Sequence, residues 1–421
     1  MEKIISLCKR RGFIYQGSEI YGGLAGTYDY GPLGVSLKNN IKDSWRKKFI
    51  SSRSDMYEVD AAILMHKKVW EKSGHVETFT DPLVECTECK KRFRKDQLIK
   101  EGVCDDCGSK IGEPKQFNMM FKSQIGAFED SSADVYLRPE TAQGIFVNFK
   151  NIMDSFHPKL PFGIAQIGKA FRNEITPRDF IFRVREFEQM EVEYFIRPEN
   201  WKKEFIYWKD EIMEWIEDIG LDMTKIHDVE IPEEDLAHYS DRTIDFEFEY
   251  PFGQKELLGL AYRSDFDLKN HDLFYQDEKE KFIPHVIEPT FGIDRLVLAL
   301  LLSSYNEEDL KRPFLKLKPS IAPVICAVSP LLKNKPELVE KAKYIHGFLK
   351  NEFGRVTWDD NGNIGKRYRR QDEIGTPWCI VIDFDTLGDN TVTVRDRDTG
   401  EQERIPQTEL VKYIKEKLVS L

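Results

Sequence analysis

Long hydrophobic runs and cysteines are both scarce in this chain of 421 residues. It holds no run of about 18 apolar residues, the length a helix needs to cross a bilayer, and its longest candidate, 296–304, suits a buried helix. The N-terminal segment MEKIISLCKRRGF lacks the apolar core and cleavage site of a secretory signal. Of seven cysteines, four form one tight cluster, a pattern that suits a reducing compartment better than a disulfide framework. We therefore expect a cytoplasmic protein with no membrane partner.

Internal repeats and low-complexity tracts are also missing, which argues against a repeat architecture. Charged residues make up 32% of the chain and hydrophobic residues 41%, as in soluble globular proteins. The formal net charge of −11 argues against indiscriminate nucleic-acid binding, although it is compatible with a local basic surface. The length predicts two or three domains with an ample core.

The segment 162–194 predicts two strands joined by a polar loop, and one face of this pair is charged. On the first strand, one face carries Ile164, Gln166, Gly168, Ala170, Arg172 and Glu174. On the second strand, the charged face carries Phe187, Gln189, Glu191 and Glu193, and the apolar face carries Met190, Val192, Tyr194 and Ile196. A sheet buried only for stability has no use for so many charges, so this face predicts a floor for a flat, charged ligand. The alternative is a solvated antiparallel ribbon whose charges face water.

The cysteine cluster consists of two CxxC knuckles, Cys86–Cys89 and Cys104–Cys107. Each knuckle can supply two thiolates, and together they complete a tetrahedral site for a structural zinc ion. Four protein ligands leave no open position, so we expect no catalytic role for this metal. The alternative is four reduced cysteines in an insertion without a metal.

Apolar residues at spacings of three and four predict several helices. A helix after Pro32 carries one apolar stripe made of Leu37, Ile41, Trp45 and Phe49. A second helix, 200–220, holds three tryptophans whose spacing favours packing over base stacking, and the acidic stretch 228–249 after it is expected to be peripheral. The apolar helix that begins near 293 contains Arg295, which needs a carboxylate or a phosphate as its partner.

A proline- and lysine-rich segment, 311–323, is the best candidate for a domain boundary. The chain beyond it alternates strands and helices, with a hairpin expected near Asp389–Asn390. The basic run 365–370 predicts either a nucleic-acid contact or a solvated helix face, and the second is the safer interpretation.

Several motifs in one order resemble class II aminoacyl-tRNA synthetases. FRNE (171–174) resembles motif 2, GIDR (292–295) heading an apolar helix resembles motif 3, and the glycine-rich turn with Pro32 resembles motif 1, which forms the dimer interface in that class. YDYGPLGVSLKNN, RPETAQGIF, AYRSDFDL and HVIEPTFGIDR are similar to the homodimeric glycyl-tRNA synthetase family, and the resemblance runs from about residue 10 to the end.

This resemblance implies an α+β fold whose catalytic domain is an antiparallel sheet flanked by helices. It places that domain at 1–310, with a zinc-knuckle insertion at about 83–115 and an acidic insertion at about 220–250. The linker 311–323 and an anticodon-binding α/β domain, 324–421, follow. The implied activity joins glycine to ATP as glycyl-adenylate and then transfers glycine to the terminal ribose of tRNA(Gly).

The resemblance also assigns site residues. Arg172, Glu174 and Arg295 are the expected catalytic residues, and Glu256 is the expected ligand of a Mg²⁺ ion that bridges the phosphates of ATP. The expected ATP-binding residues are Arg172, Asn173, Glu174, Phe182, Arg183, Phe187, Glu256, Leu257, Gly292 and Arg295. The expected glycine-binding residues are Arg94, Glu140, Phe187, Gln189, Glu191, Arg263, Glu288 and Thr290.

Glycine has no side chain to hold, so the family's carboxylates are expected to bind its ammonium group and to exclude larger amino acids. Thr290 stands where the family usually has serine; it keeps the hydroxyl and adds a methyl group. The alternatives are another class IIa synthetase, a non-catalytic tRNA-binding paralogue, and an enzyme that stops at an adenylate.

Overall fold

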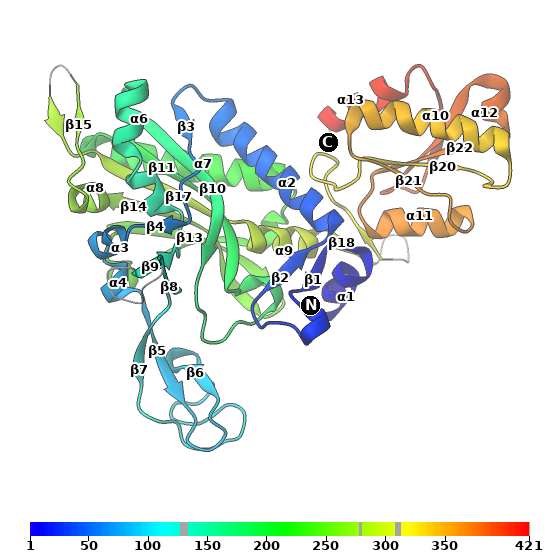
Figure 1. The fold of residues 1–421 in the computed structure, drawn as a ribbon. Helices are drawn as coiled ribbons and strands as arrows, with labels where there is room; N and C mark the ends of the chain where they lie inside the picture. The colour runs from blue at the N-terminus through cyan, green and yellow to red at the C-terminus, as the bar shows by residue number, and fades with distance from the viewer. Residues whose placement is uncertain (127–133, 278–279, 308–312, 421) are drawn as a thin grey trace.

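The computed structural model describes residues 1–126, 134–277, 280–307 and 313–420, and its two largest sheets lie in separate parts of the molecule (Figure 1). The larger sheet has seven strands in the order β12-β13-β14-β17-β11-β10-β3. In that order the strands span Ile226–Glu230, Arg242–Tyr250, Gly253–Ser264, His285–Gly292, Glu186–Ile196, Phe162–Phe171 and Met56–Glu58. Every neighbouring pair is antiparallel except β10 and β3. The α+β class and the antiparallel catalytic sheet are thus confirmed.

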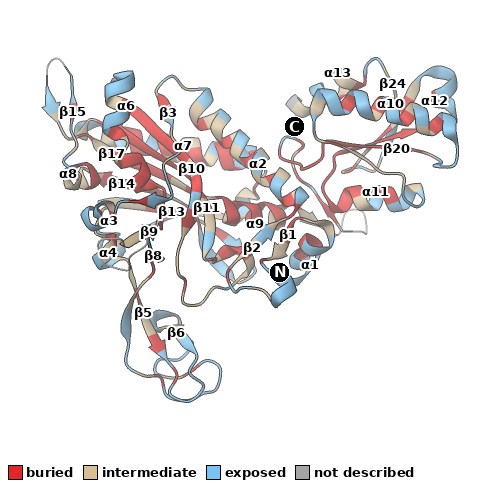
Figure 2. Cartoon of the chain, in the orientation of Figure 1, coloured by how far each residue is buried: buried red, intermediate tan, exposed pale blue. Residues whose placement is uncertain are grey.

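The apolar face of the predicted strand pair is buried under the helices that the sequence identified. Met190, Val192, Tyr194 and Ile196 join one hydrophobic core with residues of α2 (Pro32–Arg46), α7 (Trp201–Asp218) and α9 (Ile293–Ser304). The stripe Leu37, Ile41, Trp45 and Phe49 has no exposed surface, and Trp208 and Trp215 of α7 pack in the same core. Figure 2 shows this buried layer along the centre of the larger domain. The tryptophans therefore pack, as predicted.

The other face of the sheet is divided. At the start of β10, Phe162 and Ile164 pack with Phe195 beneath two short helices, α5 (Ala142–Phe146) and α6 (Phe149–Phe156). The charged residues of this face are spread along the β10–β11 pair: Arg172 and Glu174 follow the end of β10, whereas Glu193 lies opposite Ile164, beside this apolar region. The expected ligand floor is therefore a polar patch beside a second hydrophobic core.

The acidic stretch 228–249 is not peripheral as expected, because β12 and β13 extend the catalytic sheet beyond β14. Alternate residues of β13, Ile244, Phe246 and Phe248, are buried in the main core. The many acids hid this alternation, since they occupy the opposite face of the strand.

The remaining elements of the larger domain surround the sheet or extend from it. The helices are α1 (Glu2–Arg11), α3 (Lys67–Lys72), α4 (His75–Thr78) and α8 (Phe266–Asn270). The short strands are β1 (Ile14–Gln16), β2 (Tyr28–Tyr30), β4 (Leu64–Met65), β8 (Lys122–Gln124), β9 (Asp134–Leu137), β15 (Tyr275–Gln276), β16 (Lys281–Phe282), β18 (Tyr305–Asn306) and β19 (Phe314–Leu315). A separate lobe contains β5 (Thr80–Glu85), β6 (Arg92–Arg94) and β7 (Lys115–Asn118), and it projects away from the sheet (Figure 1).

The C-terminal part contains a five-stranded sheet in the order β21-β20-β22-β23-β24. The strands span Val356–Trp358, Cys326–Pro330, Trp378–Ile382, Thr391–Asp396 and Gln402–Pro406, and the helices are α10 (Pro336–Phe353), α11 (Ile364–Glu373), α12 (Phe384–Asp389) and α13 (Leu410–Ser420). No hairpin lies at Asp389–Asn390, where α12 ends instead. Reciprocal capping bonds between Asp383 and Thr386 start that helix, and the hairpin connects β23 to β24.

One further expectation needs correction, and another holds only in part. The segment predicted as a linker is partly structured: β19 pairs with β18, and Leu315, Leu317 and Ile321 are buried in the main core. In the basic run, Lys366 and Arg369 are exposed on α11, as a solvated helix face requires, but Arg367 is buried and donates to the carbonyls of Gly362 and Pro330. Across the described residues, every helix falls short of the length and apolarity needed to cross a membrane.

Candidate active site

A cavity of about 550 Å³ lies on the polar half of the catalytic sheet. The residues predicted from the sequence that line it are Arg94, Glu140, Arg172, Glu174, Phe182, Arg183, Phe187, Gln189, Glu191, Glu256, Leu257, Glu288, Thr290, Gly292 and Arg295. They come from β11, β14, β17, the connection between β10 and β11, and the start of α9, with Arg94 from β6 and Glu140 from the segment after β9. The fold thus gathers side chains that are far apart in the sequence. Two expected residues, Asn173 and Arg263, are not part of the lining.

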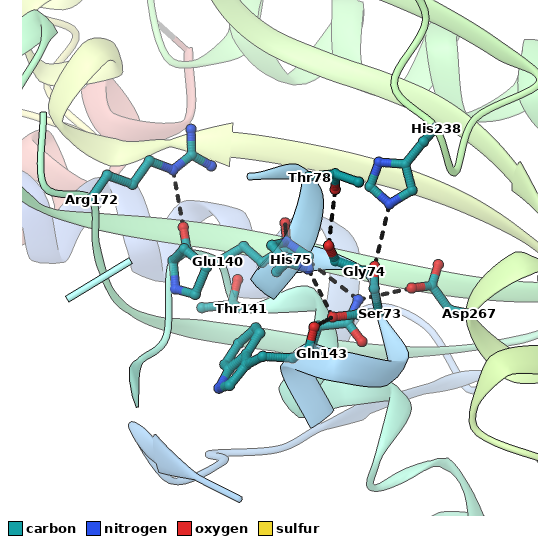
Figure 3. Close-up of polar contacts among 12 residues, drawn as sticks. Ser73, Gly74, His75, Thr78, Glu140, Thr141, Gln143, Arg172, His238 and Asp267 are labelled. Carbon is teal, nitrogen blue, oxygen red and sulfur yellow. Dashed lines mark hydrogen bonds and ion pairs between the residues drawn. The ribbon is translucent and has the colours of Figure 1, made fainter. Parts of the chain in front are cut away.

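One end of the cavity combines arginines with aromatic rings. The guanidinium of Arg172 lies between the rings of Phe79 and Phe187, at 5.3 and 5.2 Å from their centroids. Its Nε donates to the Pro139 carbonyl at 3.0 Å, as Figure 3 shows, and among the described residues no hydrogen-bond partner takes its two terminal nitrogens. A fixed guanidinium with two outward donors suits a phosphate or a carboxylate.

Arg295 has a carboxylate as its partner in this structure. Its Nη1 lies 3.1 Å from the Glu256 carboxylate, and its guanidinium lies 4.4 Å from the centre of the Phe182 ring. The positive charge of Arg295 holds the pKa of Glu256 below its ordinary value, so this half-exposed carboxylate is ionised at neutral pH. Of the two partners foreseen for Arg295, the structure shows the carboxylate.

The opposite end of the cavity is acidic. Glu140, Glu191 and Glu288 are buried there with 7%, 2% and 6% of their surfaces exposed. Glu191 accepts hydrogen bonds from the hydroxyls of Thr141 and Thr290, the second at 2.8 Å. Thr290 therefore makes through its hydroxyl the contact that a serine at this position could also make.

Burial, followed by the charges of Glu288 and Glu140, raises the pKa of Glu191 to about 8. The two threonine hydrogen bonds oppose this shift without cancelling it. Negative charge is thus in excess at this end, and a bound cation would stabilise the ionised form of Glu191. A small ammonium group fits this chemistry.

Arg263 is close to the acids but lies behind the cavity wall. It is 1% exposed, and it pairs with Asp267 and Glu288 at 2.7 Å each while stacking 3.7 Å from the Tyr239 ring centre. It therefore reaches the expected substrate region only through Glu288. Asn173 uses its backbone N–H to bond the Met119 carbonyl at 2.7 Å.

Sequence reasoning missed several lining residues, among them Tyr239, Thr243 and Asp245. Burial and the charges of Glu256 and Glu247 raise the pKa of Asp245 to about 7, so this carboxylate belongs to the same electrostatic environment as Glu256. The alternation RTIDFEFEY in β13 could have revealed Thr243 and Asp245, but Tyr239 lies in a loop without a periodic pattern.

The four knuckle cysteines come together in the projecting lobe. The Cys86 and Cys107 sulfurs are 3.5 Å apart, those of Cys89 and Cys104 are 3.6 Å apart, and all four lie within 4.8 Å of one another. Sulfurs at about 2.3 Å from one zinc ion lie roughly 3.8 Å apart at the corners of a tetrahedron. The donor set and its spacing therefore fit zinc.

Comparisons with known proteins agree with this geometry. Residues 121–305 match the family model described as the tRNA synthetase class II core domain (G, H, P, S and T), and residues 325–417 match the anticodon binding domain model. The fold is also similar to that of the Giardia lamblia prolyl-tRNA synthetase in complex with prolyl-adenylate, with a TM-score of 0.73 at 18% identity, over 99% of this chain and 78% of that one. That likeness supports the fold alone.

Closer relatives are curated glycine–tRNA ligases. The chain is 49% identical to the enzyme of Caldanaerobacter subterraneus subsp. tengcongensis, covering 99% of this chain and 98% of the relative. It is 46% identical to the enzyme of Thermus thermophilus, covering 99% of each chain. At this identity and coverage, the protein belongs to the glycine–tRNA ligase family of class II aminoacyl-tRNA synthetases.

Proposed function

We infer that the protein activates glycine with ATP, forming glycyl-adenylate and pyrophosphate, and then transfers glycine to the 3′-terminal ribose of tRNA(Gly). The observation that carries this proposal is one cavity with arginines and aromatic rings at one end and buried acids at the other. The first end suits a nucleotide and its phosphates, and the second suits the ammonium group of a small amino acid.

In the first step, a glycine carboxylate oxygen attacks the α-phosphorus of ATP, and pyrophosphate leaves. Arg172 is well placed to hold both the amino acid carboxylate and the α-phosphate, because its terminal nitrogens are available and two rings fix its plane. Arg295 and Arg183 would hold the β- and γ-phosphates or flank the adenine, Glu174 would accept from the adenine amino group, and Phe187 would stack on the base. The positive charges of the three arginines would offset the negative charge that accumulates in the transition state.

The pair of carboxylates at Glu256 and Asp245 supports a magnesium site at the phosphate end. Hard divalent cations prefer carboxylate oxygens, and burial followed by the charges of Glu256 and Glu247 raises the pKa of Asp245 to about 7. Glu256 would hold Mg²⁺, which would supply positive charge to offset that of the phosphates. Arg295, the present partner of Glu256, would then be available to the nucleotide.

Selection of glycine follows from the acidic end. Glu140, Glu191 and Glu288 would surround the ammonium group, and their bulk would leave little room for a side chain. The non-catalytic paralogue is less favoured because Arg172, Glu174, Glu256 and Arg295 are all present and all line one cavity. We further propose a structural zinc ion, a homodimer and a cytoplasmic location, by analogy with the family.

The test is ATP–pyrophosphate exchange on zinc-replete protein, with each amino acid in turn and no tRNA. Exchange driven by glycine alone supports both adenylate chemistry and the acidic pocket. Exchange driven by a different amino acid would keep the fold and overturn the assigned specificity. Folded protein that exchanges with no amino acid would favour the non-catalytic paralogue.

A further inference from the structure

His75 is a buried histidine that contacts the acidic end of the cavity from outside the sheet. It is 3% exposed, and its Nε2 lies 3.2 Å from the Glu140 carboxylate. On the other side of the ring, Nδ1 lies 2.8 Å from the Ser73 hydroxyl. Figure 3 shows His75 between Ser73 and Glu140.

The partners of the ring determine which nitrogen carries a proton. Nε2 faces a carboxylate, so it must present an N–H there, because a lone pair in that position would repel the oxygen. The Ser73 hydroxyl, 2.8 Å from Nδ1 and 3.3 Å from the Trp70 carbonyl, can donate to the nearer Nδ1, which suits this arrangement when the imidazole is neutral. Ser73 and His75 therefore form a short chain that ends in a donor aimed at Glu140.

Glu140 needs such a donor because its neighbours are acids. Burial by itself raises the pKa of Glu140, but the charge and hydrogen bond of His75, with Arg263 and Arg172 further away, bring it below its ordinary value. Glu191, in the same pocket without such a partner, has its pKa raised to about 8. Glu140 therefore stays ionised beside these acids, and His75 makes the largest contribution to lowering its pKa.

The ring cannot easily move away from Glu140. It packs against Trp70 and Phe79, with centroids 5.5 Å away in each case, and Asn118 donates to the carbonyls of His75 and Val76. His238 bonds the Ser73 carbonyl at 3.3 Å on the far side of the turn. Since Asn118 ends β7 and Phe79 precedes β5, these contacts fix His75 at the base of the projecting lobe.

We propose that His75 is a positioning residue for amino acid recognition, which holds the Glu140 carboxylate in place as the anion that receives the glycine ammonium group. This role rests on the proposed function of the cavity, and it assigns a specific task to the segment Ser73–His75. The Gln143 amide, 3.3 Å from the other oxygen of Glu140, completes the support.

The test compares two substitutions of His75. His75→Phe keeps an aromatic ring between Trp70 and Phe79 but removes the Nε2 donor, and His75→Gln restores an N–H donor without the ring. In ATP–pyrophosphate exchange, we expect His75→Phe to raise KM for glycine about tenfold or more, the size of a lost hydrogen bond to a charged group, and to leave KM for ATP within about twofold. His75→Gln should recover a substantial part of the glycine KM.

Ser73→Ala tests the same chain from its far end, and it should raise KM for glycine by a smaller factor while KM for ATP stays constant. Thermal unfolding of each variant checks the fold. If His75→Phe does not fold, the glycine KM of Ser73→Ala becomes the test of the proposed role. An unchanged glycine KM in folded His75→Phe, or an equal change for both substrates, would overturn the role of His75. Wild-type protein without glycine-dependent exchange would instead contradict the proposed function, and the role of His75 with it.

Discussion

Glu193 has no exposed surface, and neither of its carboxyl oxygens has a hydrogen-bond donor among the described residues. Its carboxyl group lies near those of Glu191 and Glu288. Burial and the charge of Glu288 raise the pKa of Glu193 well above its ordinary value of 4.5, although Arg263 opposes this. The native protein therefore holds a proton that the unfolded chain releases. The resulting stabilisation is complete below about pH 4.5 and is lost as the pH rises toward the pKa of the folded state.

Glu193→Gln should remove the loss of stability that the wild type shows as the pH rises, because glutamine keeps the shape of a protonated glutamate and does not titrate. We expect the variant to melt higher than the wild type at pH 8, by roughly 2 °C for each 1 kcal/mol gained, with a difference that shrinks toward pH 5. The measurement is the melting temperature from pH 5 to pH 8, with Glu416→Gln on the surface as the control. A difference between variant and wild type that does not depend on pH would show that Glu193 is ionised in the folded protein.

Single residues were predictable from the sequence where they lie on long strands. Alternation alone put Arg172, Gln189 and Glu191 on one face, because the period of a strand does not depend on what surrounds it. His75 and Tyr239 were missed because they reach the site from a short helix and a loop. Only the folded chain brings such residues to Glu140 and Arg263.

At the scale of elements, the predictions that proved correct were those based on long hydrophobic patterns. The strand pair 162–194 and the helix beginning near 293 were predictable, since their hydrophobic patterns are long. The expected hairpin at Asp389–Asn390 was wrong because turn-forming residues also end helices: Asn390 adopts a left-handed conformation with φ of 57° after α12. The capping pair Asp383 and Thr386 was the signal that favoured a helix.

The zinc-knuckle lobe is an element that cannot form a large core of its own. Its buried cluster consists of Val84, Cys86, Cys104 and Ile111. A structural zinc site contributes roughly 10 kcal/mol or more of folding free energy in small domains, far more than so few apolar residues supply. The lobe should therefore depend on its metal, while the catalytic sheet should not.

We expect about one zinc ion per chain by elemental analysis, and its loss in a Cys86→Ser/Cys107→Ser variant. Chelation should make the segment between Cys86 and Gly112 sensitive to limited proteolysis, and added zinc should restore protection. The main thermal transition should change little, because the sheet has its own core. A chain that is free of metal and equally protected in this segment would contradict the zinc assignment.

At the scale of the whole molecule, the two largest sheets have separate cores, and polar contacts join the parts of the chain around them. Glu373, at the end of α11, is 1% exposed and pairs with Arg10 and Arg11 of α1, at 2.8 and 2.5 Å. Arg397 of the C-terminal part donates to the Leu317 carbonyl at 2.9 Å. The sequence indicated the boundary through prolines and lysines, but it could not show these contacts, which join residues 80 to 363 positions apart.

The contact of Glu373 with α1 should matter only for the step that uses both domains. On the proposed function, adenylate formation would take place within the cavity, whereas transfer would require one tRNA to reach that cavity while the C-terminal domain holds its anticodon end. We expect Glu373→Gln to leave glycine-dependent pyrophosphate exchange within about twofold and to lower kcat/KM for tRNA charging by about fivefold or more, because Arg10 and Arg11 lose the charge of the buried Glu373 carboxylate. Glu352→Gln, in an exposed pair with Lys415 inside the C-terminal domain, is the matched control and should change neither rate. Equal losses in exchange and charging would show that Glu373 supports the fold of the catalytic domain rather than the placement of the two domains.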